Sequence, residues 1–263
     1  MRIGIVQFAP KLREVERNLR LAERLIRAND ADLFVLPELF ATGYFFKDKD
    51  EIRPFAEKFQ KSKTLTFLAD IAYEKDCAII GCFPELSGEK IFNSSAFIYP
   101  RGKKVLYRKV HLFNNEKLIF EPGNLPFPLV EYRDTKIAFI ICFDWFFPEV
   151  YRSLALKGAQ LVCHSANLVL PHCQKASYAH AVSNRIFIAL SNRTGSDVNG
   201  GGKVDFTGKS IMYGPDGSVL GELGMDEEGV LVIEIDPSKA LDKMVTPFND
   251  VILDRRPEFY EGL

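Results

Sequence analysis

Three side chains with complementary chemistry follow apolar segments of this chain: Glu38, Lys109 and Cys142. A thiolate is a nucleophile, a carboxylate can take the thiol proton and pass it to a leaving nitrogen, and an ammonium group can stabilise the charge that develops on the electrophile. Together they suit attack on the carbon of an amide or a nitrile. Taken singly, each also fits a structural role, as a first-turn helix acid, a solvated hairpin end and a buried thiol.

The segment around Cys142 is the most informative. Residues 137–141 are all apolar, which is typical of a strand buried on both faces, and the cysteine follows directly. Pro148 suits the first position of a helix, and Glu149 would lie in its first turn, where the helix dipole favours a carboxylate. The pattern predicts a thiol at a strand-to-helix turn, where neighbouring backbone amides could hold an oxyanion.

The other two residues also follow predicted strands. Residues 32–36 form a buried strand in this interpretation, with Glu38 at its carboxyl end, where polar site residues gather in α/β sheets. Residues 92–99 and 104–108 are predicted to be two strands of a hairpin, joined by a Pro-Arg-Gly turn. Lys109 directly follows the second strand. A loop-rich stretch follows the lysine, of the kind that often carries function.

The rest of the chain alternates strands and helices, which predicts an α/β fold. Helices are expected at 15–27, 62–75, 150–157 and 177–185, and further strands at 1–8, 77–83, 161–164, 186–190, 210–213, 218–221 and 229–235. The glycine-rich segment 196–203 is predicted to be a mobile loop. No low-complexity linker divides the chain, so one domain over residues 1–263 is expected. The aromatic and charged segment 248–260 is expected to lie against another surface.

Composition narrows the class of protein and its partners. Lys plus Arg number 34 and Asp plus Glu number 35, so the net charge of −1 indicates no nucleic-acid or acidic-membrane partner. The five cysteines lack CxxC spacing, which favours a reducing, cytoplasmic location. No leader pattern begins the chain, and no apolar run approaches the ~20 residues that span a bilayer. A soluble protein without cofactor or metal is expected.

Motifs in sequence order now identify a family resemblance. The glutamate lies in Leu36–Leu39, the lysine in Tyr107–Phe113 and the cysteine in Ile141–Glu149; supporting matches are Gln7, Asn93-Ser94, 120–123, 155–159, 184–185, 206–210 and 254–258. Over nearly its whole length the chain resembles the nitrilase superfamily of carbon-nitrogen hydrolases. The resemblance implies a four-layer α-β-β-α sandwich. It also implies a homodimer in which the C-terminal tail, about residues 248–263, crosses to the partner.

The resemblance assigns roles to the matching residues. It implies that Cys142 is the nucleophile and Glu38 the general base, that Lys109 and the backbone amide of Phe143 stabilise the tetrahedral intermediate, and that Glu116 positions substrate or orients the lysine. An amide would give an acyl thioester and a nitrile a thioimidate, so these residues do not separate amidase from nitrilase. Lys109 would lower the pKa of the thiol and burial beside Glu38 would raise it, a balance that the sequence leaves open.

The substrate class depends on fewer observations. Tyr44, Trp145 and Asn167 are expected near the mouth of the site, with core packing as the alternative for each. Relatives that accept carbamoyl amino acids or α-keto acid amides often carry an arginine a few residues after the cysteine, where it could bind a carboxylate. Here residues 145–147 are Trp-Phe-Phe. A small neutral aliphatic amide or nitrile is therefore favoured. Ser183 is a second departure, since many relatives have glutamate there.

Three other interpretations rank lower. A papain-like protease needs a histidine base, and no histidine lies in that family's local context; the candidates are His111, His164, His172 and His180. A zinc site from two adjacent Cys-His pairs does not match structural zinc spacings; its residues would be Cys163, His164, His172 and Cys173. A non-catalytic binding or scaffold member of the superfamily would have lost a residue of the Glu-Lys-Cys triad, and all three are present.

Overall fold

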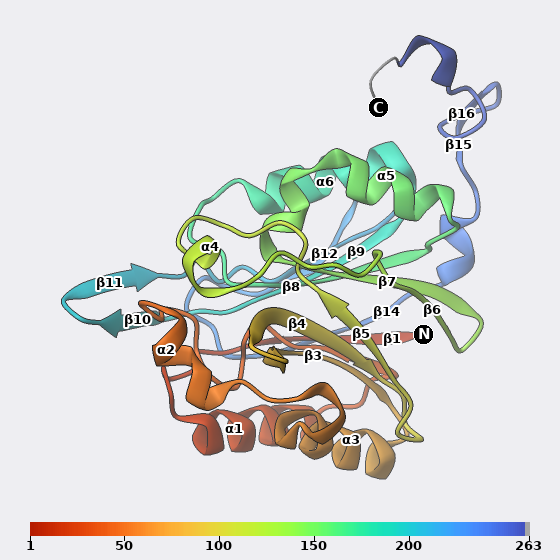
Figure 1. Cartoon of the computed structure of the whole chain (residues 1–263). Helices are drawn as coiled ribbons and strands as arrows, with labels where there is room; N and C mark the ends of the chain where they lie inside the picture. The colour runs from red at the N-terminus through yellow and green to blue at the C-terminus, as the bar shows by residue number, and fades with distance from the viewer. Residues whose placement is uncertain (261–263) are drawn as a thin grey trace.

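The computed structural model describes residues 1–260 and contains two six-stranded sheets stacked face to face. The strand order is β14-β1-β2-β3-β4-β5 in the first sheet and β13-β12-β9-β8-β7-β6 in the second. Figure 1 shows α1 and α3 on the outer side of the first sheet, and α5 and α6 on the outer side of the second. This arrangement is the predicted α-β-β-α sandwich.

The first sheet has a parallel centre with antiparallel flanks. Strands β1, β2 and β3 are parallel, β4 and β5 continue from β3 as antiparallel neighbours, and β14 pairs antiparallel with β1. The bounds are β1 Arg2–Gln7, β2 Leu33–Val35, β3 Ala78–Ser87, β4 Lys90–Ile98, β5 Lys104–Arg108 and β14 Gly229–Glu234. Its covering helices are α1 (Val15–Arg27) and α3 (Lys63–Lys75). Ser62 caps α3: its hydroxyl oxygen accepts a hydrogen bond from the amide of Leu65, which satisfies one free N–H of the helix.

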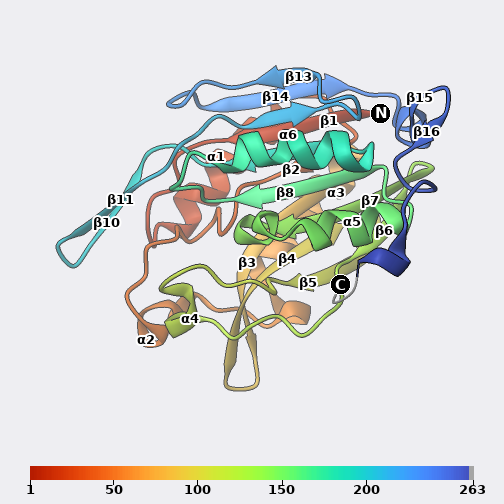
Figure 2. The ribbon, with the colours of Figure 1, turned by 90° about the horizontal axis from the view of Figure 1, so that it is seen from above.

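The second sheet repeats this plan. Strands β7, β8 and β9 are parallel, with antiparallel neighbours on both sides. The bounds are β6 Leu129–Tyr132, β7 Thr135–Ile141, β8 Leu161–Ala166, β9 Phe187–Asn192, β12 Ile211–Tyr213 and β13 Val219–Glu222. Helices α5 (Pro148–Leu156) and α6 (Cys173–Asn184) run side by side over it, as Figure 2 shows from above. Pro148 is the first residue of α5, as predicted.

The main core lies between the two sheets. One continuous cluster of buried apolar residues draws on both of them, with Ile3, Ile80 and Phe97 from the first and Phe139 and Ile188 from the second. A second cluster fills the space beneath α1 and α3. Strands of the parallel centre are buried on both faces, which accounts for their almost unbroken apolar sequences.

The segment 196–203 was predicted to be a mobile loop, and this prediction is wrong. It contributes to a hairpin of β10 (Ser196–Asn199) and β11 (Gly202–Asp205), which Figures 1 and 2 show extending beyond the sandwich. Gly200 and Gly201 both have positive φ, 55° and 82°, as a two-residue hairpin turn of type I′ requires. The glycines therefore mark a tight turn, which composition alone does not distinguish from mobility.

Several short helices occupy segments between the larger elements. They are α2 Lys49–Ile52, α4 Glu116–Ile119 and the 3-10 helices η1 Arg53–Phe55, η2 Phe59–Lys61, η3 Cys142–Phe146, η4 Pro237–Ala240 and η5 Pro257–Phe259. Helix α6 begins at Cys173, four residues before the start predicted at 177. None of the helices in residues 1–260 is long and apolar enough to cross a membrane.

The C-terminal segment leaves the sandwich after η4. It forms the small pair β15 (Met244–Thr246) and β16 (Asn249–Asp250) and reaches over the ends of the outer helices in Figure 1. Large apolar side chains of this segment face solvent, with Phe248 90% and Leu253 82% exposed. Residues 261–263 of the predicted tail lie outside the described part of the chain.

Candidate active site

Three strand ends meet where the two sheets face each other. Strand β2 ends just before Glu38 and β5 just before Lys109, both in the first sheet, and β7 of the second sheet ends just before Cys142. All three side chains are buried. The Lys109 Nζ donates hydrogen bonds of 2.7 Å to Glu38 Oε1 and of 2.7 Å to Glu116 Oε1. The fold therefore joins Glu38, Lys109 and Glu116 in one hydrogen-bonded cluster, and Cys142 lies close enough for the charges of all three to act on the pKa of its thiol.

The Glu38 carboxyl group is held on one side only. Its Oε1 accepts hydrogen bonds from Lys109 and from Asn93 Nδ2 (2.7 Å), whereas its buried Oε2 has no hydrogen-bond partner within residues 1–260. Burial raises the pKa of Glu38 to about 7, against the opposing effect of the Lys109 charge. A carboxyl group with this pKa can both accept and return a proton near neutral pH.

Lys109 keeps its charge although it is buried. Burial lowers its pKa, but the negative charges of Glu116 and Glu38 outweigh burial, and the pKa lies well above the ordinary value. Its backbone is fixed too, since its N–H donates to the Asn93 carbonyl and its carbonyl accepts from the Gly123 amide, both at 2.8 Å. A Cβ at Gly123 would lie 2.1 Å from the Arg108 carbonyl oxygen, so this close approach requires glycine.

Cys142 has an uncommon backbone conformation, with φ of +39°. It starts η3 directly after β7, and its Sγ lies 4.0 Å from the Asn167 carbonyl oxygen. Burial and then the Glu38 charge raise the pKa of the thiol well above its usual value, and Lys109 offsets this only in part. The sequence left open whether the pKa of this thiol is raised or lowered. In the structure it is raised, so the resting thiol is protonated and needs a base before it can attack.

Glu116 is buried in α4 and anchors the lysine from the opposite side. Its Oε1 accepts from the Tyr44 hydroxyl (2.7 Å) as well as from Lys109, and its Oε2 accepts from the Phe113 amide (3.1 Å). Burial, followed by the Glu116 charge, raises the pKa of Tyr44 well above its usual value, so the phenol stays a donor. Tyr44 therefore fixes the orientation of Glu116.

A buried ion pair supports the Tyr44 segment, and sequence analysis missed it. The Arg193 guanidinium donates two hydrogen bonds of 2.9 and 3.0 Å to the Asp197 carboxylate. Asp197 Oδ2 also accepts from the backbone amides of Tyr44 and Phe45, at 2.9 and 3.1 Å. The available signal was a spacing of four residues between opposite charges, but Asp197 lay in the segment predicted to be mobile.

Cys142 opens into a small, mostly apolar pocket of about 20 Å³. Its other lining residues are Phe113, Phe143, Trp145, Asn167, Leu168, Val169 and Leu170. A second pocket of about 100 Å³ contains Tyr44 and Glu116 and shares Phe113 and Val169 with the first. Tyr44, Trp145 and Asn167, which were expected near the mouth of the site, each line one of these two adjoining pockets.

The Asn167 side chain is the polar feature of the Cys142 pocket. It is 2% exposed, and neither its oxygen nor its nitrogen has a hydrogen-bond partner within residues 1–260. Buried polar atoms of native proteins are nearly always hydrogen-bonded. An amide group in this state, facing a pocket beside a thiol, can bind a polar group of a small substrate.

Asp144 connects the cysteine turn to the lysine segment, and sequence analysis missed it as well. Its Oδ2 accepts from the Tyr107 hydroxyl (2.7 Å) and the Ile141 amide (3.0 Å). Its Oδ1 accepts from the amide (3.3 Å) and Nδ1 (2.8 Å) of His111. The signal was a single carboxylate among aromatic residues two positions after the cysteine. Its partners Tyr107 and His111 lie more than 30 residues away and had no local signal.

The geometry also bears on the rival interpretations. His164 contacts Cys142 through the backbone carbonyl, at 2.9 Å from Nε2, and not through the sulfur that a protease-like base would need to reach. His111 is held by Asp144 instead. Within residues 1–260 no three His, Cys, Asp or Glu side chains are grouped so that they could hold a metal, so the zinc set is not assembled.

A buried Glu-Lys-Cys cluster on an α-β-β-α sandwich defines an enzyme that cleaves carbon-nitrogen bonds through a cysteine. The family model for carbon-nitrogen hydrolases matches residues 2–241. The chain is 39% identical over 263 residues to a protein named nitrilase from Pyrococcus abyssi, with 99% of both chains covered. It is 32% identical over 246 residues to an (R)-stereoselective amidase from a Pseudomonas species, with 91% of this chain and 87% of the relative covered.

Solved structures of an amidase from a Nesterenkonia species have the same fold. One superposes with a TM-score of 0.84 at 29% identity and covers 99% of this chain and 95% of the other. In another, acrylamide is attached by Michael addition to the active-site cysteine, and this chain has a cysteine at the matching position. The chain belongs to the carbon-nitrogen hydrolase family.

The Asp144 network yields a stability prediction. Replacing Asp144→Asn keeps the shape but removes acceptor capacity from a group that receives four hydrogen bonds, and each buried donor left without an acceptor costs about 1–3 kcal/mol. We expect the free energy of unfolding in urea to fall by at least about 2 kcal/mol. The control Asp205→Asn, on the exposed β11, should leave it nearly unchanged. Equal unfolding midpoints for the two variants would contradict the structural role of Asp144.

Proposed function

We propose that this protein hydrolyses a small, neutral, aliphatic amide to the carboxylic acid and ammonia, with Cys142 as nucleophile, Glu38 as general base and acid, and Lys109 as the group that stabilises the tetrahedral intermediate. One observation carries the proposal: a buried lysine donates to two carboxylates beside a buried thiol. Lys109 is thereby fixed as a cation, and the free Oε2 leaves Glu38 able to bind a proton.

In the first stage of the proposed reaction, Cys142 attacks the amide carbon while its proton passes to Glu38. The carbonyl oxygen becomes an oxyanion, which Lys109 and the Phe143 amide stabilise. The carbon-nitrogen bond then breaks, the Glu38 proton goes to the departing nitrogen, and ammonia leaves. An acyl thioester on Cys142 remains. The raised pKa of the thiol supports coupling of proton transfer to attack, since a free thiolate is disfavoured at rest.

In the second stage, Glu38 exchanges a proton with water instead of with the leaving nitrogen. Glu38 takes a proton from the water as it attacks the thioester carbon, and the same donors stabilise the second oxyanion. Collapse of this intermediate breaks the carbon-sulfur bond, releases the acid and returns the proton to Cys142. A pKa of about 7 at Glu38 suits both the acceptance and the return of protons.

The preference for a neutral, small substrate follows from the two pockets. Of the described residues that line them, Glu116 is the charged one, and it would repel a substrate carboxylate. Phe143 and Trp145 supply apolar walls, and the unpartnered Asn167 amide supplies a polar contact. The Nesterenkonia amidase has been solved in complex with butyramide, which is an amide of this class.

Nitrile hydrolysis is the second candidate, because the 39% identical relative from Pyrococcus abyssi is named nitrilase. Attack of the thiol on a nitrile carbon gives a thioimidate, and one water must add before ammonia leaves. The same three residues would serve this reaction. A purely binding or scaffold role is disfavoured because Glu38, Lys109 and Cys142 are all present, with Lys109 hydrogen-bonded to Glu38.

We extend the proposal to the domain and its location. Residues 1–263 would form one catalytic domain, supported by a core that joins both sheets. Five free, buried cysteines support a reducing compartment such as the cytoplasm.

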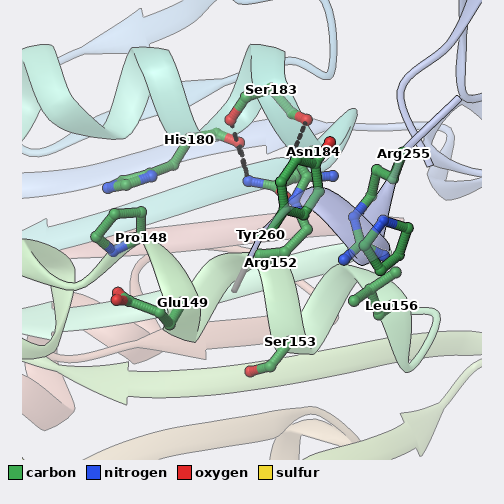
Figure 3. A pocket seen from close by; sticks show the side chains of 11 residues that line it. Pro148, Glu149, Arg152, Ser153, Leu156, His180, Ser183, Asn184, Arg255 and Tyr260 are labelled. Atoms are coloured by element: carbon green, nitrogen blue, oxygen red, sulfur yellow. Dashed lines mark hydrogen bonds between the residues drawn. The ribbon is translucent and has the colours of Figure 1, made fainter. Parts of the chain in front are cut away.

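We also propose a homodimer that forms over α5 and α6. A groove of about 450 Å³ lies between these helices and the C-terminal segment. Figure 3 shows the side chains that line it. Its lining residues are Pro148, Glu149, Arg152, Ser153, Leu156, His180, Ser183, Asn184, Arg255, Pro257 and Tyr260. Exposed apolar side chains lie on the same segment, with Phe259 70% exposed, and burial by a partner would stabilise them. Ser183, the departure from relatives with glutamate, lies in this groove and away from the Cys142 pocket.

The function is tested by ammonia release from short aliphatic amides, mono- and dinitriles, ω-amides of carboxylic acids and carbamoyl compounds. We expect butyramide-sized neutral amides to be the best substrates, and Cys142→Ala to abolish the activity. Cys163→Ala is the matched control, because this cysteine is also buried but lies within β8. Equal activity of wild type and Cys142→Ala would refute the nucleophile. A best substrate that carries a carboxylate would refute the proposed pocket chemistry.

The pH dependence follows from the raised pKa of Glu38. Glu38 must be ionised to accept the thiol proton, so kcat/KM should fall about tenfold per pH unit below about pH 7. The effect of Glu38 on stability does not account for this loss. The folded-state pKa is above the ordinary 4.5, so the folded state binds a proton that the unfolded chain releases between pH 4.5 and 7, and this group stabilises the fold more at the lower pH. A flat profile from pH 5 to 8 with a neutral amide would contradict Glu38 as the base.

The dimer is tested by placing a charge on the outer helices. Leu156→Glu changes an α5 side chain that is 45% exposed in the single chain and lines the groove. We expect light scattering to give a dimer mass for wild type and a monomer mass for this variant, because a buried, unpaired charge is costly. Tyr73→Glu, on α3 at the opposite outer layer, should stay dimeric. An unchanged mass for Leu156→Glu would exclude this face.

A further inference from the structure

A buried histidine lies behind the cysteine turn and has no part in the mechanism above. His164 is on β8, is fully buried, and places its Nε2 at 2.9 Å from the Cys142 carbonyl oxygen. A carbonyl oxygen only accepts hydrogen bonds, so Nε2 carries the proton and donates it. Burial lowers the pKa of His164 to about 4, which keeps the imidazole neutral near pH 7.

The second ring nitrogen connects this contact to an outer helix. With the proton on Nε2, Nδ1 has a free lone pair and lies 4.0 Å from Cys173 Sγ, at the start of α6. Cys173 Sγ in turn lies 3.9 Å from the Ser177 hydroxyl. The thiol is the group that can donate to Nδ1, so these contacts favour the tautomer that holds the Cys142 carbonyl.

Holding the carbonyl also fixes the next amide. In a planar trans peptide the C=O and the N–H point in opposite directions, so the Phe143 N–H points away from β8 when the Cys142 carbonyl points towards His164. Phe143 is the second residue of η3, and the first N–H groups of a helix have no acceptor inside the helix. This peptide follows a residue with φ of +39°, a conformation that needs support from its surroundings.

We propose that His164, with Cys173 behind it, is a positioning residue that aims the Phe143 N–H at the oxyanion of the reaction intermediates. The inference rests on the proposed function, because it assumes attack by Cys142 next to this amide. Loss of one oxyanion donor typically lowers kcat by about 10²–10³-fold. Misorientation of the amide should therefore lower kcat by about 10-fold or more, with little change in KM.

The test compares two amide side chains at position 164. His164→Gln places an amide nitrogen near the position of Nε2 and can still donate to the Cys142 carbonyl, whereas His164→Asn is one bond shorter and falls short of it. We expect the Gln variant to keep kcat within about 3-fold of wild type and the Asn variant to lose about 10-fold or more. His164→Leu, which keeps bulk without a donor, is a second donor-free variant, so the comparison stands if one of the two fails to fold.

A second measurement distinguishes a change in the orientation of the Phe143 amide from a change in the reactivity of the Cys142 thiol. Methyl methanethiosulfonate transfers a methylthio group to Cys142 with sulfinate as leaving group, and no oxyanion forms on a carbonyl. The rate of this modification, followed by mass spectrometry of the Cys142 peptide, should stay within about 3-fold of wild type in the donor-free variants, because no oxyanion donor is needed. A fall that matches the loss of kcat would place the effect on the sulfur and overturn the proposal.

Two controls keep the outcomes distinct. Cys163→Ala alters the neighbouring buried position of β8 and should retain wild-type kcat. A loss of kcat in this variant too would show that any loss of packing in β8 lowers activity. Cys142→Ala tests the proposed function itself: if it stays active, that function fails. If Cys142→Ala is inactive while folded donor-free His164 variants keep full kcat, the proposed function stands and the role of His164 is refuted.

Discussion

The structure depends on one buried cation. Lys109 donates to Glu38 and Glu116 at 2.7 Å, with no exposure of its side chain to solvent. Two carboxylates around one ammonium group would leave a net negative charge in the protein interior, which is costly. Burial raises the pKa of Glu38 to about 7, with the Lys109 charge opposing this effect and the Glu116 charge adding to it, so that proton uptake by Glu38 can relieve the excess charge. The cluster that stabilises the lysine therefore also creates a group able to exchange protons at neutral pH.

The neighbours of this cluster keep its two carboxylates different. Glu116 accepts hydrogen bonds from Tyr44 and from the Phe113 amide in addition to Lys109. Glu38 has Asn93 as its one further donor within residues 1–260, and its second oxygen is unpartnered. The two glutamates thus have different surroundings: both oxygens of Glu116 accept hydrogen bonds, whereas one oxygen of Glu38 has no partner within residues 1–260 and is open to a proton.

Local sequence patterns predicted the elements that carry the chemistry. The segments predicted at 32–36, 104–108 and 137–141 contain β2, β5 and most of β7, and the reactive residues follow these strands. Family motifs extended this to the sandwich and the cluster. The Asp144 partners on the lysine segment could not be predicted because they are distant in sequence. The Arg193–Asp197 pair and the hairpin of β10 and β11 are local, but the glycines of segment 196–203 favoured a loop there. A local sequence pattern does not indicate which buried donor will form a hydrogen bond with which acceptor.

The reaction centre is divided between the two sheets, and this gives the core a direct role in chemistry. Glu38 and Lys109 belong to the first sheet and Cys142 to the second, so the side chains packed between the sheets set the distance from base to nucleophile. Asp144 reinforces this distance, since it follows a strand of the second sheet and binds Tyr107 and His111 beside the lysine strand. Close-packed interiors adjust little to a change of shape. A substitution in the core between the sheets can therefore alter proton transfer without touching any residue of the site.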